Sequence, residues 1–457
     1  MTKVVVKKLK DCLSPGQLLT ADEDRLCYSY DATGKMYLPD VVVKARSTKD
    51  ISAVLKIAHE ESIPVIPRGS GSGFAGGSTP VQGGIALVLS EMNRILEIDR
   101  ENLMATVEPG VITGTLQKTV QQYGLFYPPD PSSMKVSTIG GNTATCAGGP
   151  RAVKYGVTKE YILGVEAVLP DGEIVQTGGK LTKNVAGYDL TALFVGSEGT
   201  LGVISKLILK LIPSPETTQT LFALFPTIED ASKAVSAIIA SKIIPSTLEF
   251  MDQQTLFCVK DTIPGGLPEK TEASLLIEVD GDSEASVERQ KEMVEKILQS
   301  HNVNSINVAI ESGEREALWA VRRSISPALG KLRPTKVNQD IAVPRSRIPE
   351  MIQGLQQIAS KYQLLIVNFG HAGDGNIHVN IMTDINNVAE YERAEVAVTE
   401  IFACTLRLGG TISGEHGIGI AKRNYLQDQV GKAGISLMRH IKSVFDPKNI
   451  MNPGKIL

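Results

Sequence analysis

The 457-residue chain has few cysteines, histidines and aromatic residues, and it carries little net charge. Its five cysteines are scattered without a Cys-x-x-Cys pair, which argues against a zinc ribbon or an iron–sulfur centre of its own. A formal charge of −3 gives no electrostatic case for binding nucleic acid or an anionic membrane. No apolar run approaches the roughly 20 residues of a membrane-spanning helix. Because the N-terminus also lacks a signal-peptide core, we expect a cytoplasmic protein with reduced thiols.

What remains is the composition of an ordinary globular protein, 42% hydrophobic and 21% charged, that is long enough for two or three domains. Short apolar runs alternate with helical periodicity up to a Pro-Ser-Pro sequence at 213–215, which predicts an α+β or α/β first domain. We expect strands at 40–45, 63–67, 85–89 and 105–108, and helices at 48–61 and 111–123.

After residue 215 a new series of strand and helix patterns begins, which predicts a second, sheet-based domain. We expect its strands at 220–225, 247–251, 273–279, 305–309, 364–369 and 377–382, and its helices at 228–240 and 284–300. The last residues are again punctuated by glycine and proline. We therefore divide the chain into a first domain of residues 1–215, a second domain of residues 216–407 and a C-terminal segment of residues 408–457.

Three glycine-rich loops stand out in the first domain. The first, residues 67–77, contains Gly71-x-Gly73-x-x-Gly76, which matches the dinucleotide fingerprint. A Rossmann fold is rejected because no helical sequence follows the loop. On its own the loop is either a phosphate-binding run of backbone N–H groups or a plain surface loop. The other two loops, at 127–149 and 196–204, favour a long, thin ligand that touches the backbone at several points.

These loops together resemble the FAD-binding domain of the vanillyl-alcohol oxidase / p-cresol methylhydroxylase superfamily. With the histidine segments described below, the chain resembles the branch of D-lactate, D-2-hydroxyglutarate and glycolate dehydrogenases that includes the glycolate oxidase FAD subunit. The resemblance implies an α+β fold, in which a two-part FAD-binding domain is joined to an α+β cap domain with an antiparallel sheet. The C-terminal segment 408–457 would return to the FAD domain.

The resemblance also implies which residues bind FAD. The first loop would hold the pyrophosphate, the second would line the isoalloxazine and ribityl groups, and the third would clasp the adenine half. The implied residues are Pro67, Arg68, Gly69, Ser70, Gly71, Ser72, Gly76, Gly77, Pro129, Asp130, Ser132, Thr138, Ile139, Gly140, Gly141, Asn142, Ala144, Ala147, Gly148, Gly149, Tyr155, Gly156, Glu198, Gly199, Gly202, Val203, Ile204 and Asn452. Asn452 lies in a C-terminal Asn-Pro-Gly, which is either a cofactor contact or a simple turn.

Some members of the superfamily attach their flavin covalently through a histidine in the first loop. This chain has Ser70 and Ser72 there, and it has no histidine between His59 and His301. We therefore expect FAD that is bound without a covalent link.

Half of the six histidines lie in two short glycine-framed segments, 369–380 and 413–417. Asp-Gly between two strand-like runs predicts a hairpin, across which His371 and His378 would face each other at a distance that suits one metal ion. Asn380 would point to the same face as His378, and Glu415 could supply a third ligand. Two histidines and one carboxylate leave open positions on zinc, or on iron or manganese.

The alternative for a single histidine in a turn is a hydrogen-bonding surface group. In the branch that the chain resembles, the two histidines and the glutamate are metal ligands, which implies His371, His378 and Glu415 here. The resemblance then implies that His416 is the base beside them, with Asn380 on the substrate side.

A 2-hydroxy acid also needs a fixed cation for its carboxylate. Arg322 and Arg323 are either solvated helix residues or carboxylate ligands, and the resemblance assigns the role to Arg322. Several relatives carry a further basic residue where this chain has Asn338, and Lys336 lies two positions away. We therefore expect a small substrate such as lactate or glycolate rather than a dicarboxylate.

The sequence as a whole predicts FAD-dependent oxidation of a D-2-hydroxy acid to the 2-oxo acid. The electrons would pass to electron-transfer flavoprotein, an iron–sulfur subunit or quinone, and direct reoxidation by oxygen stays open. A homodimer is compatible with the sequence. The alternatives are a flavin electron-transfer subunit without substrate chemistry of its own and a metal-dependent hydrolase. The first leaves the histidine segments unexplained, and the second leaves the glycine loops unexplained.

Overall fold

The structure, a computed structural model, describes residues 1–457 and divides them into two compact units. Unit 1 comprises residues 1–149, 156–214 and 415–457, and unit 2 comprises residues 150–155 and 215–414. In this division residues 415–457 belong to unit 1, and residues 408–414 belong to unit 2. The short piece 150–155 was not expected in unit 2. No helix combines the length and apolarity needed to cross a bilayer.

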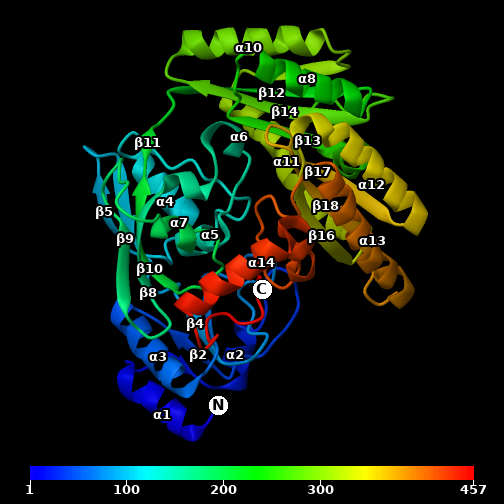
Figure 1. Cartoon of the computed structure of the whole chain (residues 1–457). Helices are drawn as coiled ribbons and strands as arrows, with labels where there is room; N and C mark the ends of the chain where they lie inside the picture. The colour runs from blue at the N-terminus through cyan, green and yellow to red at the C-terminus, as the bar shows by residue number, and fades with distance from the viewer. The chain divides into compact units, whose positions relative to one another are not determined.

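Unit 1 contains a four-stranded sheet, a five-stranded antiparallel sheet and a two-stranded ribbon (Figure 1). The four-stranded sheet has the order β1-β2-β4-β3, in which β2, β4 and β3 are parallel. Its strands are β1 (Leu18–Leu19), β2 (Val41–Lys44), β3 (Val65–Arg68) and β4 (Ile85–Val88). The five-stranded sheet, in the order β5-β6-β10-β8-β9, contains β5 (Ile95–Asp99), β6 (Met104–Val107), β8 (Ile162–Val168), β9 (Ile174–Gly178) and β10 (Val203–Lys210). The ribbon pairs β7 (Leu125–Phe126) with β11 (Ile212–Pro213).

The helices of unit 1 show how local sequence decides an element. In α3 the Ser47 side chain accepts the Asp50 N–H, an N-cap that contributes about 1 kcal/mol. The same helix buries Ile51, Val54, Leu55 and Ala58 in a cluster with the strands of the parallel sheet. The helices are α1 (Lys3–Cys12), α2 (Asp22–Cys27), α3 (Thr48–Glu61), α4 (Thr113–Gln121), α5 (Ile139–Thr145), α7 (Leu190–Phe194) and α14 (Leu426–Phe445).

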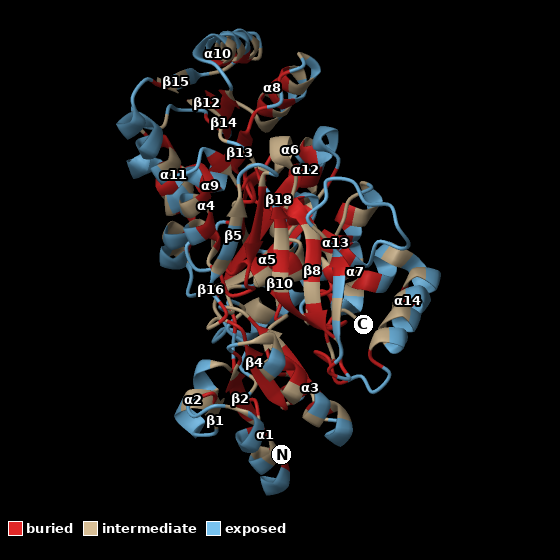
Figure 2. Cartoon of the chain, turned by 90° about the vertical axis from the view of Figure 1, so that its left-hand side faces the viewer, coloured by how far each residue is buried: buried red, intermediate tan, exposed pale blue.

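Unit 2 is built on a seven-stranded sheet in the order β15-β12-β14-β13-β17-β18-β16, with every neighbouring pair antiparallel. The strands of this sheet are mostly buried (Figure 2). They are β12 (Thr217–Phe225), β13 (Thr247–Asp252), β14 (Ala273–Gly281), β15 (Ser305–Ala309), β16 (Thr335–Ala342), β17 (Leu365–His371) and β18 (Asn376–Thr383).

Every α-helix of unit 2 contacts at least one strand of its sheet. Two of them, α9 and α11, share a hydrophobic cluster with side chains of β12, β13, β14, β17 and β18. We call the sheet surface that carries those side chains the α11 face. The helices of the unit are α6 (Ala152–Tyr155), α8 (Ile228–Ala240), α9 (Gln253–Val259), α10 (Glu284–Gln299), α11 (Ser312–Leu332), α12 (Ile348–Tyr362) and α13 (Val388–Arg407).

Candidate functional site

The predicted histidine hairpin is present, but its register differs from the one expected. A two-residue Asp374-Gly375 turn would place His371 opposite His378, whereas the strands are joined by four residues, 372–375. His371 therefore pairs with Asn376, and His378 pairs with Phe369. The direct opposition of the two histidines is wrong. Because the shift is an even number of residues, both still point to the same face of the sheet, as diagonal neighbours.

The turn itself depends on a close approach of the backbone. A Cβ on Gly375 would lie 1.9 Å from the Val343 carbonyl oxygen, and the φ of Gly375 is +85°. Only glycine fits this combination of contact and backbone conformation. The turn is thereby held against the end of β16.

The two histidines offer a pair of nitrogen donors with the spacing of a metal site. Their Nε2 atoms lie 3.4 Å apart, and the two side chains are only 2% and 7% exposed. Two nitrogens at zinc–nitrogen distances of about 2.0–2.1 Å in a tetrahedral site are separated by roughly 3.3–3.4 Å. The separation exceeds the ~2.9–3.0 Å of an ordinary N–H hydrogen bond. The donor set therefore fits a zinc-like ion better than a hydrogen-bonded histidine pair.

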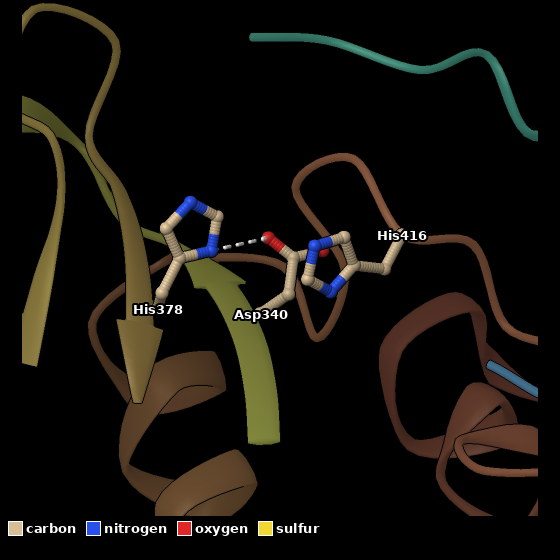
Figure 3. Close-up of side chains that lie close together, drawn as sticks. All are labelled: Asp340, His378 and His416. Atoms are coloured by element: carbon tan, nitrogen blue, oxygen red, sulfur yellow. Dashed lines mark ion pairs between the residues drawn. The ribbon is translucent and has the colours of Figure 1, made fainter. Parts of the chain in front are cut away.

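Each of these histidines has a carboxylate on its Nδ1 side. Glu249 of β13 hydrogen bonds His371 Nδ1 through Oε1. The Oδ1 atom of Asp340 in β16 lies 3.9 Å from His378 Nδ1. Figure 3 shows the two side chains directed toward each other. The Glu249 carboxylate at Nδ1 leaves Nε2 of His371 as its metal-binding atom, an arrangement common around protein metal ions. The 3.9 Å between Asp340 and His378 Nδ1 is too long for a hydrogen bond. Burial alone raises the pKa of the Glu249 carboxyl, but His371 and Arg322 together hold it below its ordinary value.

The predicted carboxylate anchor Arg322 belongs to the same cluster. Its Nε donates to Glu249 Oε2 at 2.7 Å, and its guanidinium carbon lies 4.6 Å from the centre of the Phe369 ring. The side chain is 10% exposed, and its two terminal nitrogens make no hydrogen bond in the structure. Arg323, by contrast, is exposed and pairs with Glu316, in agreement with a solvated helix residue.

Asn380 lies on the same face as His378, as predicted, and is fully buried. Its amide nitrogen donates to the carbonyl oxygens of Val367 and His378, and its Oδ1 accepts from Asn338. These bonds fix the sheet locally, so the structure gives Asn380 a supporting role. Its contact with substrate stays a prediction.

Glu415 and His416 follow directly after unit 2. The amide of Gly414, the last residue of that unit, donates to Asp340 at 3.0 Å. Within unit 1, Glu415 packs against Gly148, where an added Cβ would meet its Oε2 at 2.8 Å. The His416 ring lies 5.3 Å from the ring of Phe74 in the first glycine loop. Both residues thus stand beside predicted FAD loops.

The three glycine-rich loops come together in unit 1. A Cβ on Gly69 of the first loop would lie 2.3 Å from Thr138 of the second, and a Cβ on Gly199 of the third would touch Pro67. The amides of Gly196 and Glu198 donate to carbonyl oxygens of the second loop, at 2.9 and 2.8 Å. Glycine at these approaches lets the three loops lie close together, and their joint contact with FAD stays a prediction.

Two predicted FAD residues instead tie the loops together. Asn452 donates from its amide nitrogen to the carbonyl oxygens of Gly77 and Glu198, at 2.8 and 2.7 Å. The buried Glu198 carboxylate accepts the N–H groups of Ile418 and Gly419. Burial raises the pKa of Glu198 above its ordinary value, although both N–H donors oppose the shift. The C-terminal segment is held on the FAD loops by these bonds.

Packing accounts for several other predicted FAD residues. Ile139 and Val203 are core side chains, and a Cβ on Gly202 would meet the Val168 carbonyl oxygen at 2.9 Å. Tyr155 lies in unit 2, where its hydroxyl donates to Asp280. Their backbones remain candidates for cofactor contacts, and their part in FAD binding stays a prediction.

Comparison with known proteins decides the family. The family model for the C-terminal domain of FAD linked oxidases matches residues 214–456, and a model for an FAD binding domain matches residues 39–178. Glycolate oxidase subunit GlcD from Bacillus subtilis is 50% identical over the whole chain and 97% of its own length. The chain belongs to the FAD-linked oxidases. It is an FAD-linked oxidoreductase, which confirms the resemblance of its glycine loops and histidine segments to that group.

Other relatives of this oxidase carry two kinds of name. Glycolate oxidase subunit GlcD from Escherichia coli is 36% identical, with 99% of this chain and 90% of the relative covered. D-lactate dehydrogenase from Archaeoglobus fulgidus is 38% identical, with 94% and 95% covered. Among solved structures, p-cresol methylhydroxylase with substrate bound matches with a TM-score of 0.83 over 99% of this chain and 96% of its own, at 20% identity. That likeness confirms the predicted fold class.

Sequence reasoning missed Glu249 as a site residue and gave Asp340 no role. The available signal for Glu249 is one acidic residue within the apolar strand Leu248–Met251. A charge at an inward strand position is rarely buried without a partner. For Asp340, the clue was its place in an otherwise uncharged segment just before Pro344.

Proposed function

We propose that this FAD-linked oxidase converts a small D-2-hydroxy acid, of the lactate or glycolate type, to the 2-oxo acid with the help of a divalent metal ion. The observation that carries the proposal is the buried His371–His378 donor pair, in which His371 shares the Glu249 carboxylate with Arg322. A metal ion held by this pair could bind the hydroxyl and carboxylate oxygens of a 2-hydroxy acid, and the Arg322 cation could pair with its carboxylate. The names of the relatives, glycolate oxidase subunit and D-lactate dehydrogenase, support the same substrate class.

Each residue of the site has a separate role in the proposed reaction. Arg322 holds the substrate carboxylate with its two terminal nitrogens, since its Nε is engaged by Glu249. His371 and His378, with Glu415 as third ligand, would hold the metal, which makes a bound hydroxyl more acidic. His416 accepts the hydroxyl proton as general base. Bound FAD would accept the hydride that leaves the substrate Cα.

The substrate is expected to be small because Asn338 is neutral and already bonded. Its amide nitrogen donates to Asn380 at 2.9 Å. Lys336 lies two residues earlier on the same face of β16, at the partly solvated end of the strand. Its Nζ lies 3.4 Å from the Ser326 hydroxyl. A second substrate carboxylate beside Asn338 would therefore lack a cation.

We propose that the electrons leave to a separate acceptor, either a partner protein or quinone. The Bacillus subtilis and Escherichia coli relatives are named as subunits, which suggests an assembly. An electron-transfer flavoprotein, an iron–sulfur subunit or quinone would complete the reaction. This step would be supported if substrate reduced the flavin of the isolated chain quickly and oxygen reoxidised that flavin only slowly.

The substrate assignment predicts which acids bleach the flavin under anaerobic conditions. D-lactate or glycolate should reduce the flavin fully, and L-lactate should not. D-2-hydroxyglutarate should react with a kcat/KM at least about tenfold lower, because its second carboxylate would be unpaired. Stopped-flow absorbance near the flavin maximum measures all four. Flavin that no hydroxy acid bleaches would instead favour an electron-transfer subunit without substrate chemistry.

Removal of the metal should distinguish its contribution to flavin reduction from that of FAD binding. Treatment with a strong chelator is expected to slow flavin reduction by about 100-fold while FAD stays bound, and Zn²⁺ should restore the rate. Elemental analysis before and after treatment gives the metal content. Full activity in metal-free protein would refute the metal part of the proposal and leave the flavin part standing.

A further inference from the structure

Glu249 occupies a position that neither the family comparison nor the proposed reaction explains. It is a fully buried carboxylate in β13, and its neighbours along the strand, Leu248 and Phe250, are buried apolar residues. A buried charge is costly unless every oxygen has a partner. Here each oxygen has a different one, namely His371 at Oε1 and Arg322 at Oε2.

The fold aligns these three residues. Glu249 and His371 are direct cross-strand partners of β13 and β17, so their side chains leave the same face side by side. Arg322 reaches the same carboxylate from α11, and its guanidinium is stacked on Phe369, two residues before His371. The His371 ring is thereby fixed by a strand and a helix at once.

The hydrogen bond also settles which ring nitrogen of His371 is presented to a metal. An ionised carboxylate can only accept, so Nδ1 must donate its proton to Glu249. The other nitrogen, Nε2, is then left with its lone pair directed to the side where His378 Nε2 lies 3.4 Å away. Without Glu249 the ring could adopt the other tautomer or turn away.

We infer that Glu249 is a positioning residue that orients His371 for metal binding and, through its second oxygen, fixes Arg322 for the substrate carboxylate. The inference rests on the proposed metal site. It adds that the metal ligand and the substrate anchor depend on one shared carboxylate. Loss of this carboxylate should disturb both functions, although Glu249 touches neither metal nor substrate.

The test is a Zn²⁺ titration of full-length, FAD-containing protein that has been stripped of metal. Competition with a chromophoric chelator gives the affinity, independently of enzyme activity. Glu249→Gln keeps the size of the side chain but removes its charge, and it should weaken Zn²⁺ binding by about 10–100-fold. The matched control is Glu278→Gln, which alters another buried carboxylate of the same sheet that is bonded to Thr220 and Trp319. It should leave the Zn²⁺ affinity within about twofold of wild type.

A loss of stability is expected in both variants and decides nothing. Glu249→Gln leaves the Arg322 guanidinium buried without its partner, so the double variant Glu249→Gln/Arg322→Met is measured as well. Its Zn²⁺ affinity should stay at least tenfold weak even where the melting temperature recovers. Wild-type affinity in either Glu249 variant would overturn the inference and leave the metal site intact. A wild-type protein that binds no Zn²⁺ would remove the metal site and the inference together.

Discussion

Replacing His416 by asparagine should slow anaerobic reduction of the flavin by D-lactate or glycolate by about 10²–10⁴-fold. The imidazole is the group proposed to take the hydroxyl proton, and asparagine cannot accept it. His416 stands against Phe74 of the first glycine loop, at a ring separation of 5.3 Å, so the proton acceptor lies beside the loops that would hold FAD. FAD content and Zn²⁺ affinity should remain those of wild type, because the residue is proposed to bind neither. Stopped-flow kinetics, the flavin spectrum and elemental analysis measure the three quantities.

The chain offers a matched control in His440. This histidine belongs to the same unit, on the exposed side of α14, and lies outside the proposed site. His440→Asn should reduce its flavin at the wild-type rate. A His416→Asn enzyme that reacts within about threefold of wild type would show that another group takes the proton.

A secondary-structure element can be predicted from the sequence when the interactions that determine it lie within the element itself. Helices α3 and α8 have the bounds that periodicity predicts, because a cap and one apolar face fix each of them locally. Helix α14 was missed, since the C-terminal residues are punctuated by glycine and proline in the sequence. In the structure Gly431 does break the helical conformation, with a φ of 73°, while the flanking turns stay helical. Helix α5 was read as a loop for the same reason, as it contains Gly140 and Gly141.

The histidine site shows, for single residues, the same difference between features that local sequence determines and features that tertiary contacts determine. Alternation within the strands was enough to place His371, His378 and Asn380 on one face. The exact register required the length of the turn, which depends on the contact between Gly375 and Val343. Glu249 is distant in sequence and reaches His371 only through strand pairing, so no local pattern could connect them.

Glycines are difficult to interpret from the sequence for a different reason, because they can serve packing or ligand binding. Gly69, Gly202 and Gly140 look alike in the sequence. A Cβ on Gly202 or Gly140 would strike the buried residues Val168 or Pro109, whereas one on Gly69 would strike Thr138 of another predicted FAD loop. A glycine needed for packing and one needed for a ligand give the same sequence signal. Only the contacts separate them, and they identify Gly69 as the position at which FAD binding can be tested.

Gly69→Val should yield a colourless protein. The added Cβ would lie 2.3 Å from Thr138 Oγ1, and Thr138 is the buried N-cap of α5, whose hydroxyl accepts the Gly141 N–H. Relieving this overlap requires either loss of the cap or separation of the first two FAD loops. We expect FAD affinity to fall by at least about 100-fold, which removes about 2.7 kcal/mol of ligand-dependent stability when FAD is in large excess. Fluorescence titration with FAD and thermal unfolding with and without it measure both effects.

The same loop supplies the control. A Cβ on Gly73 would meet no atom within 4 Å, so Gly73→Val should remain yellow and keep its FAD affinity within a fewfold of wild type. Comparison of the two variants removes the general effect of valine in this loop. If Gly69→Val also retained FAD, the contact between the first two glycine loops would have no part in holding the cofactor. If Gly73→Val lost FAD as well, the ligand would occupy space next to Gly73. The pair of variants therefore tests the FAD assignment loop by loop, without reliance on turnover.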